Sequence, residues 1–323
     1  MNKSPRIIFF GTPDFAVTSL IKLLDAGYPV VAVVTAPDKP AGRGLKERLS
    51  PVKMAAMAHE IPVLQPPKMN DPDFINHLKS LNPDLQIVIA FRMMPKSVWE
   101  LPRMGTFNLH ASLLPQYRGA APIHWAVING EKETGVTTFF INETIDTGGI
   151  LLREKVPIGD RETTGELHDR LMKIGANLVT RTVEGLFSGE IQSISQDSLY
   201  SSTNGLKTAP KIFKEDCRIL WKQPTDQVCN FIRGLSPHPG AFTEVKMTDG
   251  TVQTLKIFHA LPNIITHTLT PGIFVTDRKT FLKVSTIDGF IMINEVQLAG
   301  RKTMNTVDFL RGFGRIFPET CGI

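Results

Sequence analysis

Apolar and polar positions alternate in a regular pattern over residues 1–190. Short β-branched runs, at Arg6–Phe10 and Val30–Val34, are separated by a helical stretch over Asp14–Ala26 that Gly27 ends. The same pattern predicts three more strands and a long amphipathic helix, over Leu85–Phe91, Thr106–His110, Val136–Ile141 and Thr163–Leu186. Strands that alternate with helices are typical of a parallel sheet covered by helices. We therefore expect a Rossmann-like α/β domain with a doubly wound, mostly parallel sheet.

The pattern changes after residue 200. Residues 201–210 are rich in Ser, Thr, Asn, Gly and Lys, which is typical of a linker. A helix over Thr225–Arg233 and five short strands are predicted beyond it, at Phe242–Met247, Val252–Phe258, Pro271–Val275, Thr280–Ser285 and Ile291–Val296. Short strands joined by turns such as Asp249-Gly250 favour a small OB-like β-barrel. The sequence thus predicts a catalytic domain over 1–200, a linker over 201–210 and a second domain over 211–323.

Composition indicates an ordinary globular protein. Hydrophobic residues make up 42% of the chain and charged residues 21%. No apolar run approaches the roughly 18 residues that cross a bilayer, and the first run breaks at Gly11-Thr12-Pro13. The three cysteines and eight histidines show neither a C-x-x-C nor an H-x-x-x-H spacing. We expect a cytoplasmic protein with no membrane contact, no disulfide framework and no metal.

Positive charge is concentrated late in the chain. The formal net charge is +5; residues 1–206 carry 21 Lys and Arg against 21 Asp and Glu, and residues 207–323 carry 15 against 10. Such an excess suggests an anionic partner such as nucleic acid, although an ordinary solvated surface carries similar charge. The positive residues of this part of the chain include Lys207, Lys211, Lys214, Arg301 and Lys302.

Polar side chains that could do chemistry stand at the end of one predicted strand. Asn108 and His110 are two residues apart, so they share one face of the strand and point toward the carboxyl edge of the sheet. Asp146 lies in a glycine-rich turn further on. An Asp can orient an imidazole and an amide can donate to an oxyanion, as acyl transfer to an amine requires. On spacing alone, strand-end and turn-capping roles for the three residues stay open.

The residues around this strand resemble a known family. The run that begins at Asn108 resembles the signature of the 10-formyltetrahydrofolate-dependent formyltransferases, and it reads Asn108-Leu109-His110-Ala111-Ser112-Leu113-Leu114-Pro115-Gln116-Tyr117-Arg118-Gly119-Ala120-Ala121-Pro122-Ile123. The later Asp146-Thr147-Gly148 is similar to the family's Asp-x-Gly. The resemblance implies catalytic roles for Asn108, His110 and Asp146 and a 10-formyltetrahydrofolate cosubstrate without a metal. It also implies folate contacts from Ser112, Leu113, Leu114, Pro115, Phe91, Arg92, Met93 and Met94.

Within that family the chain most resembles members that formylate initiator methionyl-tRNA for translation initiation. The opening Phe10–Phe15 and the loop Asp38–Gly44 carry this likeness, together with Ser236–Ala241 and Leu298–Lys302 in the second domain. The likeness therefore spans nearly the full length. It implies tRNA contacts at Arg43, Lys46, Arg48, Lys207 and Lys211. We expect a monomer that binds methionyl-tRNA and needs no protein partner.

Two departures and three alternatives accompany this interpretation. The folate-side loop Ala90–Pro95 is one residue shorter than the family's A-Y-G-x-x-L-P, lacks its Gly and carries Arg92, and Gly149 stands where an Asp is common. A formyltransferase of the same family could act on a small amine instead of tRNA. A non-catalytic RNA-binding protein is a second alternative. A nucleotide-dependent oxidoreductase is a third, although Gly11-Thr12-Pro13 lacks the G-x-G-x-x-G spacing.

Overall fold

The computed structural model describes residues 5–41, 46–199, 205–314, 317 and 320–321. The chain divides into two compact units, each made of several segments. The first unit comprises Met1–Pro122, Thr134–Val156 and His168–Thr208, and the second comprises Ile123–Glu133, Pro157–Leu167 and Ala209–Ile323.

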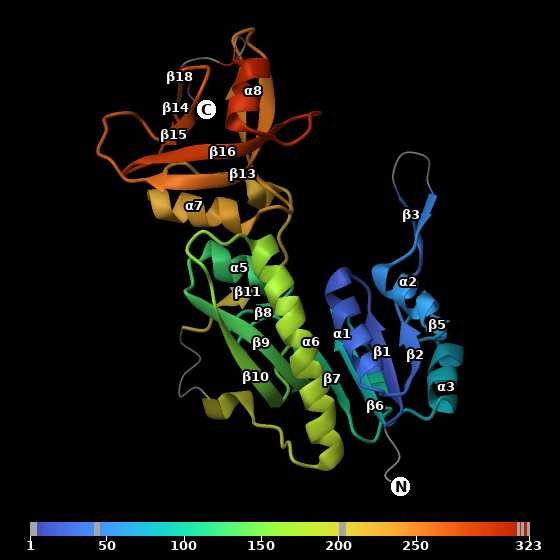
Figure 1. Ribbon diagram of the computed structural model, residues 1–323. Coiled ribbons are helices and arrows are strands. Elements are labelled where there is room, and N and C mark those ends of the chain that lie inside the picture. The colour runs from blue at the N-terminus through green and yellow to red at the C-terminus, as the bar shows by residue number, and fades with distance from the viewer. Residues whose placement is uncertain (1–4, 42–45, 200–204, 315–316, 318–319, 322–323) are drawn as a thin grey trace. The chain divides into compact units, whose positions relative to one another are not determined.

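A seven-stranded sheet forms the centre of the first unit, in the order β10-β9-β7-β6-β1-β2-β5 (Figure 1). Its strands are β1 (Ile7–Gly11), β2 (Val30–Val34), β5 (Val63–Leu64), β6 (Leu85–Ile89), β7 (Thr106–His110), β9 (Glu133–Phe140) and β10 (Ile150–Pro157). The five neighbouring strands β7, β6, β1, β2 and β5 are parallel, and β9 is antiparallel to β7. The mostly parallel α/β sheet that the sequence predicts is confirmed.

Helices and one hairpin connect these strands. They are α1 (Asp14–Asp25), the hairpin of β3 (Lys39–Ala41) and β4 (Lys46–Arg48), α2 (Pro51–Ala58), α3 (Pro72–Ser80) and α4 (Lys96–Trp99), and the long helix α6 (Thr164–Ser188) follows the last strand, β10. Helix α2 begins at a favourable N-cap, because the Ser50 hydroxyl accepts the Lys53 N–H at 3.1 Å and a proline follows Ser50. Among the residues that the structure describes, no helix is long and apolar enough to cross a membrane.

Register brings several strand ends to one edge of the sheet. Strands β1 and β6 are buried along their whole length, as expected for central strands of a parallel sheet. Gly11 pairs with Ile89 and Ile89 pairs with Leu109, so the carboxyl ends of β1, β6 and β7 lie side by side. The loops that follow these three strands therefore meet at this edge, where ligands bind in open α/β sheets.

The second unit contains an antiparallel sheet in the order β12-β13-β16-β15-β14-β18, and β17 pairs with β16. Its elements are α5 (Pro122–Ile128), which begins in the first unit, α7 (Thr225–Gly234), β12 (Ala241–Lys246), β13 (Val252–Asn263), β14 (Phe274–Thr276), β15 (Leu282–Ser285), β16 (Phe290–Leu298), β17 (Met304–Asn305), α8 (Thr306–Phe313) and β18 (Thr320–Cys321). Buried side chains from α7, α8 and the sheet pack together, among them Val228, Leu255, Phe274 and Phe309. The predicted small β domain is confirmed as an antiparallel half-barrel.

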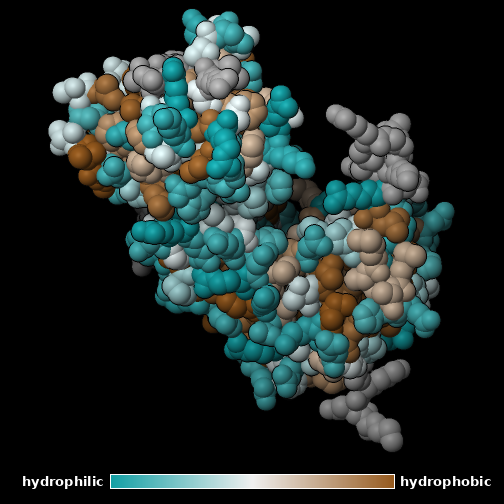
Figure 2. Space-filling view, turned by 45° about the horizontal axis from the view of Figure 1, so that its top comes forward, coloured by the Kyte–Doolittle hydropathy of each residue, from teal (hydrophilic) through white to brown (hydrophobic). Residues whose placement is uncertain are grey.

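The surface mixes hydrophilic residues with separate hydrophobic groups, as Figure 2 shows for one face. The large apolar side chains that are exposed include Met57 on α2, Met93 after β6 and Ile264 after β13. Scattered apolar side chains of this kind are normal on soluble domains.

Candidate active site

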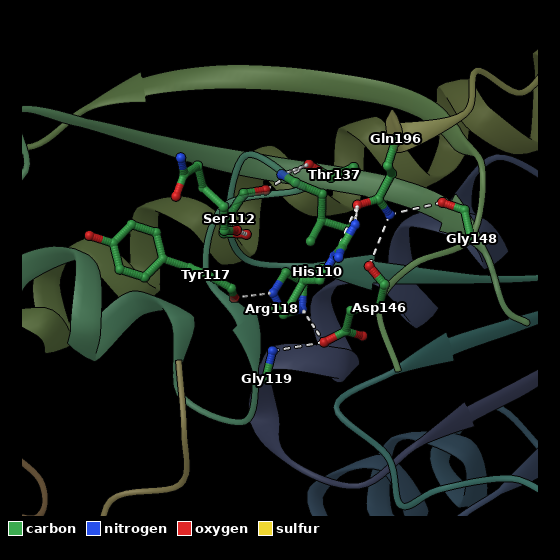
Figure 3. A network of polar contacts seen from close by, with 11 residues as sticks. His110, Ser112, Tyr117, Arg118, Gly119, Thr137, Asp146, Gly148 and Gln196 are labelled. Atoms are coloured by element: carbon green, nitrogen blue, oxygen red, sulfur yellow. Dashed lines mark hydrogen bonds and ion pairs between the residues drawn. The ribbon is translucent and has the colours of Figure 1, made fainter. Parts of the chain in front are cut away.

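His110 is the last residue of β7, and its ring is buried between two acceptor groups (Figure 3). Its Nε2 atom lies 2.8 Å from the carbonyl oxygen of Tyr117. Its Nδ1 atom lies 3.9 Å from Oδ2 of Asp146. A carbonyl oxygen can only accept, so Nε2 carries the hydrogen, and the Nδ1 of a neutral ring is left as an acceptor. The ring is thus prepared to take a proton at Nδ1, on the side that faces a carboxylate.

The Asp146 carboxylate is held at this position by a main-chain N–H of the segment after β7. Its Oδ2 accepts the N–H of Gly119 at 2.9 Å (Figure 3). Asp146 has φ of +55°, a left-handed conformation that is rare for residues with a side chain. Gly148 follows where a Cβ atom would lie 1.6 Å from the carbonyl oxygen of Phe140, so only glycine fits there. The close approach of Gly148 to the Phe140 main chain therefore restricts the conformation of the turn.

Three left-handed residues surround this site. Ala90, Tyr117 and Asp146 have φ of +47°, +60° and +55°, and none is glycine. Such conformations cost on the order of 1 kcal/mol or more each and gather at functional sites. Tyr117 is fixed by its N–H, which donates to the carbonyl oxygen of Lys207 at 2.7 Å. The two residues that face the His110 ring, Tyr117 and Asp146, both belong to this group.

Gln196 binds the turn of Asp146, and Arg118 binds Gln196. From the sequence, no role in the site is predicted for either residue. The Gln196 amide nitrogen donates to the carbonyl oxygens of Asp146 and Gly148, at 2.9 Å each. Its amide oxygen accepts from the Arg118 guanidinium at 2.6 and 3.2 Å (Figure 3). Gln196 stands 50 residues after Asp146, in a short 3-10 helix that carries no motif. Nothing in the sequence signals this contact.

Asn108 lies on the same face of β7 as His110, two residues before it. Its Cα pairs with Val88 of β6 and Phe139 of β9, in the interior of the sheet. Its side chain is partly buried. Within the described part of the chain, no hydrogen bond engages the Asn108 amide. The amide is therefore available to a ligand.

The predicted folate residues after β7 form a tightly bonded loop. Ser112 is fully buried, and its hydroxyl donates to the carbonyl oxygen of Gln116 at 2.6 Å. The Thr137 hydroxyl donates to the carbonyl oxygen of Ser112 at 2.6 Å and accepts the Leu114 N–H at 3.2 Å. Leu114 and Pro115 are buried, whereas Leu113 is partly exposed. Their contact with folate stays a prediction.

The other predicted folate residues follow β6, next to β7. Phe91 is partly buried with its ring edge-on to Phe10, and Met94 is buried, whereas Met93 is 75% exposed. The Arg92 guanidinium donates to the carbonyl oxygens of Pro66 and Pro67 and lies 5.7 Å from the Phe91 ring. The residue that departs from the family pattern is therefore bound to the segment after β5.

The predicted tRNA residues are distributed over both units. Arg43 and the Lys46 side chain lie outside the described residues. Arg48 is exposed at the end of β4. Lys207 is exposed, and its main-chain N–H donates to the Gln116 side chain at 2.8 Å, which brings it next to Tyr117. Lys211 is exposed in the second unit, 5.2 Å from the Phe213 ring.

A polar network braces the hairpin whose predicted tRNA contact is Arg43. The Lys53 ammonium donates to the Asp38 carboxylate and to the Gln65 side chain, the latter at 2.8 Å. The Gln65 amide in turn donates to Asp38 at 3.0 Å. Hydrogen bonds from Lys53 and then Gln65 lower the pKa of Asp38. Asp38 thus acts as an anchor at the start of the hairpin.

Two further observations on the described residues help to locate the site. A cavity of about 420 Å³ opens at the opposite edge of the sheet, where Arg6 and Arg103 bind Asp84. Among the described residues, no three His, Cys, Asp or Glu side chains are arranged to hold a metal ion. The carboxyl edge around His110 is therefore the candidate active site.

Comparison with known proteins shows the family of the chain. The formyl transferase family model matches residues 5–183, and the model of the formyl transferase C-terminal domain matches residues 211–314. Methionyl-tRNA formyltransferase of Bacteroides fragilis is 52% identical over 310 residues, which cover 95% of each chain. The chain belongs to the methionyl-tRNA formyltransferase family. The family member of Parabacteroides distasonis is 51% identical over 318 residues, 98% of each chain.

Solved structures share the fold of the family. One is an N-formyltransferase from Helicobacter canadensis in complex with folinic acid and dTDP-3-aminofucose, with a TM-score of 0.64. It is 20% identical and aligns with 90% of this chain and 98% of its own. Another is HypX from Aquifex aeolicus in complex with tetrahydrofolic acid, with a TM-score of 0.63, 18% identity, and coverage of 96% of this chain and 48% of its own. At 18 to 20% identity, these likenesses show a shared fold.

Proposed function

We propose that the chain transfers the formyl group of 10-formyltetrahydrofolate to the α-amino group of methionyl-tRNA. One observation carries the chemistry: His110 Nδ1 and Asp146 Oδ2 lie 3.9 Å apart at the end of β7. The Asn108 amide, which makes no hydrogen bond to any residue that the structure describes, lies on the same strand face. The acceptor follows from the methionyl-tRNA formyltransferases that are about half identical over nearly the whole chain.

The attacking amine fits between His110 and Asp146. Two acceptors 3.9 Å apart can both bind one nitrogen at ordinary hydrogen-bond distances. The neutral amine bound there attacks the formyl carbon, and the carbonyl oxygen becomes an oxyanion. Asn108 donates its amide N–H to that oxyanion. A donor fixed in place before the reaction stabilises the transition state, because no reorganisation is required when the charge appears.

His110 carries the proton through the reaction. Its Nδ1 accepts the proton of the attacking amine, while the Tyr117 carbonyl oxygen keeps the Nε2 hydrogen in place. The nearby Asp146 carboxylate stabilises the resulting imidazolium. When the bond from the formyl carbon to N10 breaks, the imidazolium returns the proton to N10. The products are the formylated amine and tetrahydrofolate, and the enzyme ends in its starting protonation state.

The folate donor is assigned to the loops after β6 and β7. Phe91 and Leu113 are partly exposed and offer apolar contact to a ring system. The strands before these loops pair at Ile89 and Leu109, so the loops start from one edge of the sheet. Folate ligands in the structures from Helicobacter canadensis and Aquifex aeolicus support this choice of donor.

The tRNA acceptor is assigned to positive side chains of both units. The hairpin with Arg43, Lys46 and Arg48 and the exposed Lys207 and Lys211 would contact its backbone. Phosphate contacts release counterions, so affinity for tRNA falls steeply with added salt. A constant affinity for tRNA between about 50 and 200 mM salt would contradict the assignment. Because methionyl-tRNA is a substrate of translation, the proposal includes a role in translation initiation in the cytoplasm.

The decisive test follows a labelled formyl group. The protein and labelled 10-formyltetrahydrofolate are incubated in three parallel reactions, one each with methionyl-tRNA, uncharged tRNA and glycinamide ribonucleotide. Label on methionyl-tRNA alone is the expected result. Label on the small amine alone would keep the chemistry but overturn the acceptor, and label on none of the three would overturn the proposed function.

A further inference from the structure

We propose that Gln196 is a positioning residue for formyl transfer, which sets the place of the Asp146 carboxylate through the main chain of its turn. The proposal rests on the proposed function, because it takes Asp146 as part of the site. Gln196 touches neither His110 nor Asn108 through any bond that the described residues show. Its effect therefore passes entirely through Asp146 and the turn.

Every hydrogen-bonding group of the Gln196 amide faces the turn or Arg118. The side chain is buried, and its two N–H groups donate to Asp146 O and Gly148 O. Its oxygen accepts both Nε and Nη2 of Arg118. A primary amide has two donor hydrogens and one acceptor oxygen, so all of them are used. A side chain whose hydrogen-bonding groups are all used holds its partners in place better than one that is only partly bonded.

Arg118 determines which way the amide points. A guanidinium only donates, so the Gln196 oxygen must face Arg118 and the nitrogen must face the turn. The two carbonyls of the turn only accept, and they select the same orientation. The amide therefore has one arrangement that satisfies all its partners. Glutamate at this position would keep the contact with Arg118 but would offer no donor to the turn.

The turn needs this support because its backbone is strained at the functional residue. Asp146 has φ of +55°, and the main chain of a non-glycine residue prefers other conformations. The two donations of Gln196 lie on either side of Thr147 and hold the carbonyls of Asp146 and Gly148 together. Without them the turn can relax and move the carboxylate from His110 Nδ1. Misplacement by about 1 Å can reduce a rate on the order of 100-fold.

Gln196→Glu separates positioning from simple packing. It preserves side-chain size and the Arg118 contact, and it loses both donations to the turn. We expect kcat to fall roughly 10- to 100-fold, with KM for the folate donor and for methionyl-tRNA nearly unchanged. Gln196→Met, which also keeps the side-chain volume, should lower kcat similarly. It replaces the glutamate variant in the test if that variant does not fold. The matched control is Asp197→Asn, an exposed neighbour in the same short helix that should retain wild-type kcat.

A double-mutant cycle then tests the route of the effect. If Gln196 acts through Asp146, Gln196→Glu should lower kcat much less in an Asp146→Asn background than in the wild type. Wild-type kcat in both Gln196 variants, or losses that multiply fully with Asp146→Asn, would overturn the positioning role. A wild-type protein that formylates no acceptor would overturn the proposed function instead, and this assignment with it.

Discussion

The His110 Nδ1 atom lies 3.9 Å from Asp146 Oδ2, too far for a direct hydrogen bond and near enough for one nitrogen to bind both. The carboxylate is fixed on its other side by the Gly119 N–H at 2.9 Å. The pair is therefore arranged around a third atom. In the proposed reaction that atom is the attacking amine, and the charge of Asp146 is needed when His110 becomes an imidazolium.

Asp146→Asn should consequently impair turnover far more than folding. The amide keeps the size of the side chain and can still accept from Gly119, but the negative charge is gone. We expect kcat to fall roughly 100- to 10,000-fold, the usual contribution of a general acid–base group, because His110 can act as that group only while the Asp146 charge stabilises its imidazolium. Single-turnover formyl transfer and thermal unfolding measure the two effects, with the exposed Asp25→Asn as control. Near-normal turnover would remove Asp146 from the mechanism.

Asn108→Ala tests the oxyanion donor. The amide has no hydrogen bond to lose in the described structure, so the variant should unfold at nearly the wild-type temperature. Loss of one preorganised donor should lower kcat on the order of 100- to 1000-fold. Asn108→Asp should be slower still, since a carboxylate repels an oxyanion. If the aspartate variant matched the wild type in kcat, Asn108 would have no role as donor.

Much of the fold follows from the sequence because its central strands are buried on both faces. Strands β1, β2, β6 and β7 lie within two residues of their predicted bounds, and in β1 and β2 an unbroken apolar run is the clear signal. Strand β10 gave no such signal, because Arg153, Glu154 and Lys155 interrupt it. Helix α8 was also missed, as it has only eight residues and contains Gly312.

The candidate site is predictable where side chains form a motif and unpredictable where main-chain atoms act. Strand-end position and the family signature together indicate Asn108, His110 and Asp146, and the structure brings His110 and Asp146 together. Tyr117 faces the His110 ring through its carbonyl oxygen, which any residue would provide. Gln196 binds two carbonyls 48 and 50 residues away. Contacts of this kind depend on tertiary structure, so no local sequence pattern predicts them.

Gly148→Ala should disrupt the Asp146 turn directly. The added Cβ would lie 1.6 Å from the Phe140 carbonyl oxygen, a backbone atom that cannot move aside by rotating. We expect the turn to shift and formyl transfer to fall by more than about 10-fold, since small misplacements are costly in an active site. Circular dichroism and the transfer assay separate unfolding from loss of activity.

Gly312→Ala provides the matched control for that substitution. A Cβ at Gly312 meets nothing within 4 Å, and this glycine lies inside helix α8. Alanine there should stabilise the protein by about 0.5–1 kcal/mol and leave activity unchanged. Equal activity of the Gly148 and Gly312 variants would show that the turn tolerates displacement.

The Asp38 anchor predicts a pH-dependent contribution to stability. Hydrogen bonds from Lys53 and Gln65 to the carboxylate lower its pKa in the folded protein. An acid whose pKa is lower when folded stabilises the fold fully above its unfolded value of about 3.9, and this stabilisation is lost as the pH falls toward the folded value. Wild type should therefore exceed Asp38→Asn in free energy of unfolding at neutral pH, and the difference should shrink below about pH 4.

Urea unfolding of both proteins across this range measures that difference. Lys53→Met, which removes the first donor, should lower stability at neutral pH, and combining it with Asp38→Asn should add little, because the two residues share one interaction. A difference between wild type and Asp38→Asn that stayed constant down to about pH 3 would show that the charge of Asp38 is not the source of the stabilisation. The hairpin would then be held by its main chain, since Lys39 pairs with Arg48 and Ala41 with Lys46 whatever the state of Asp38.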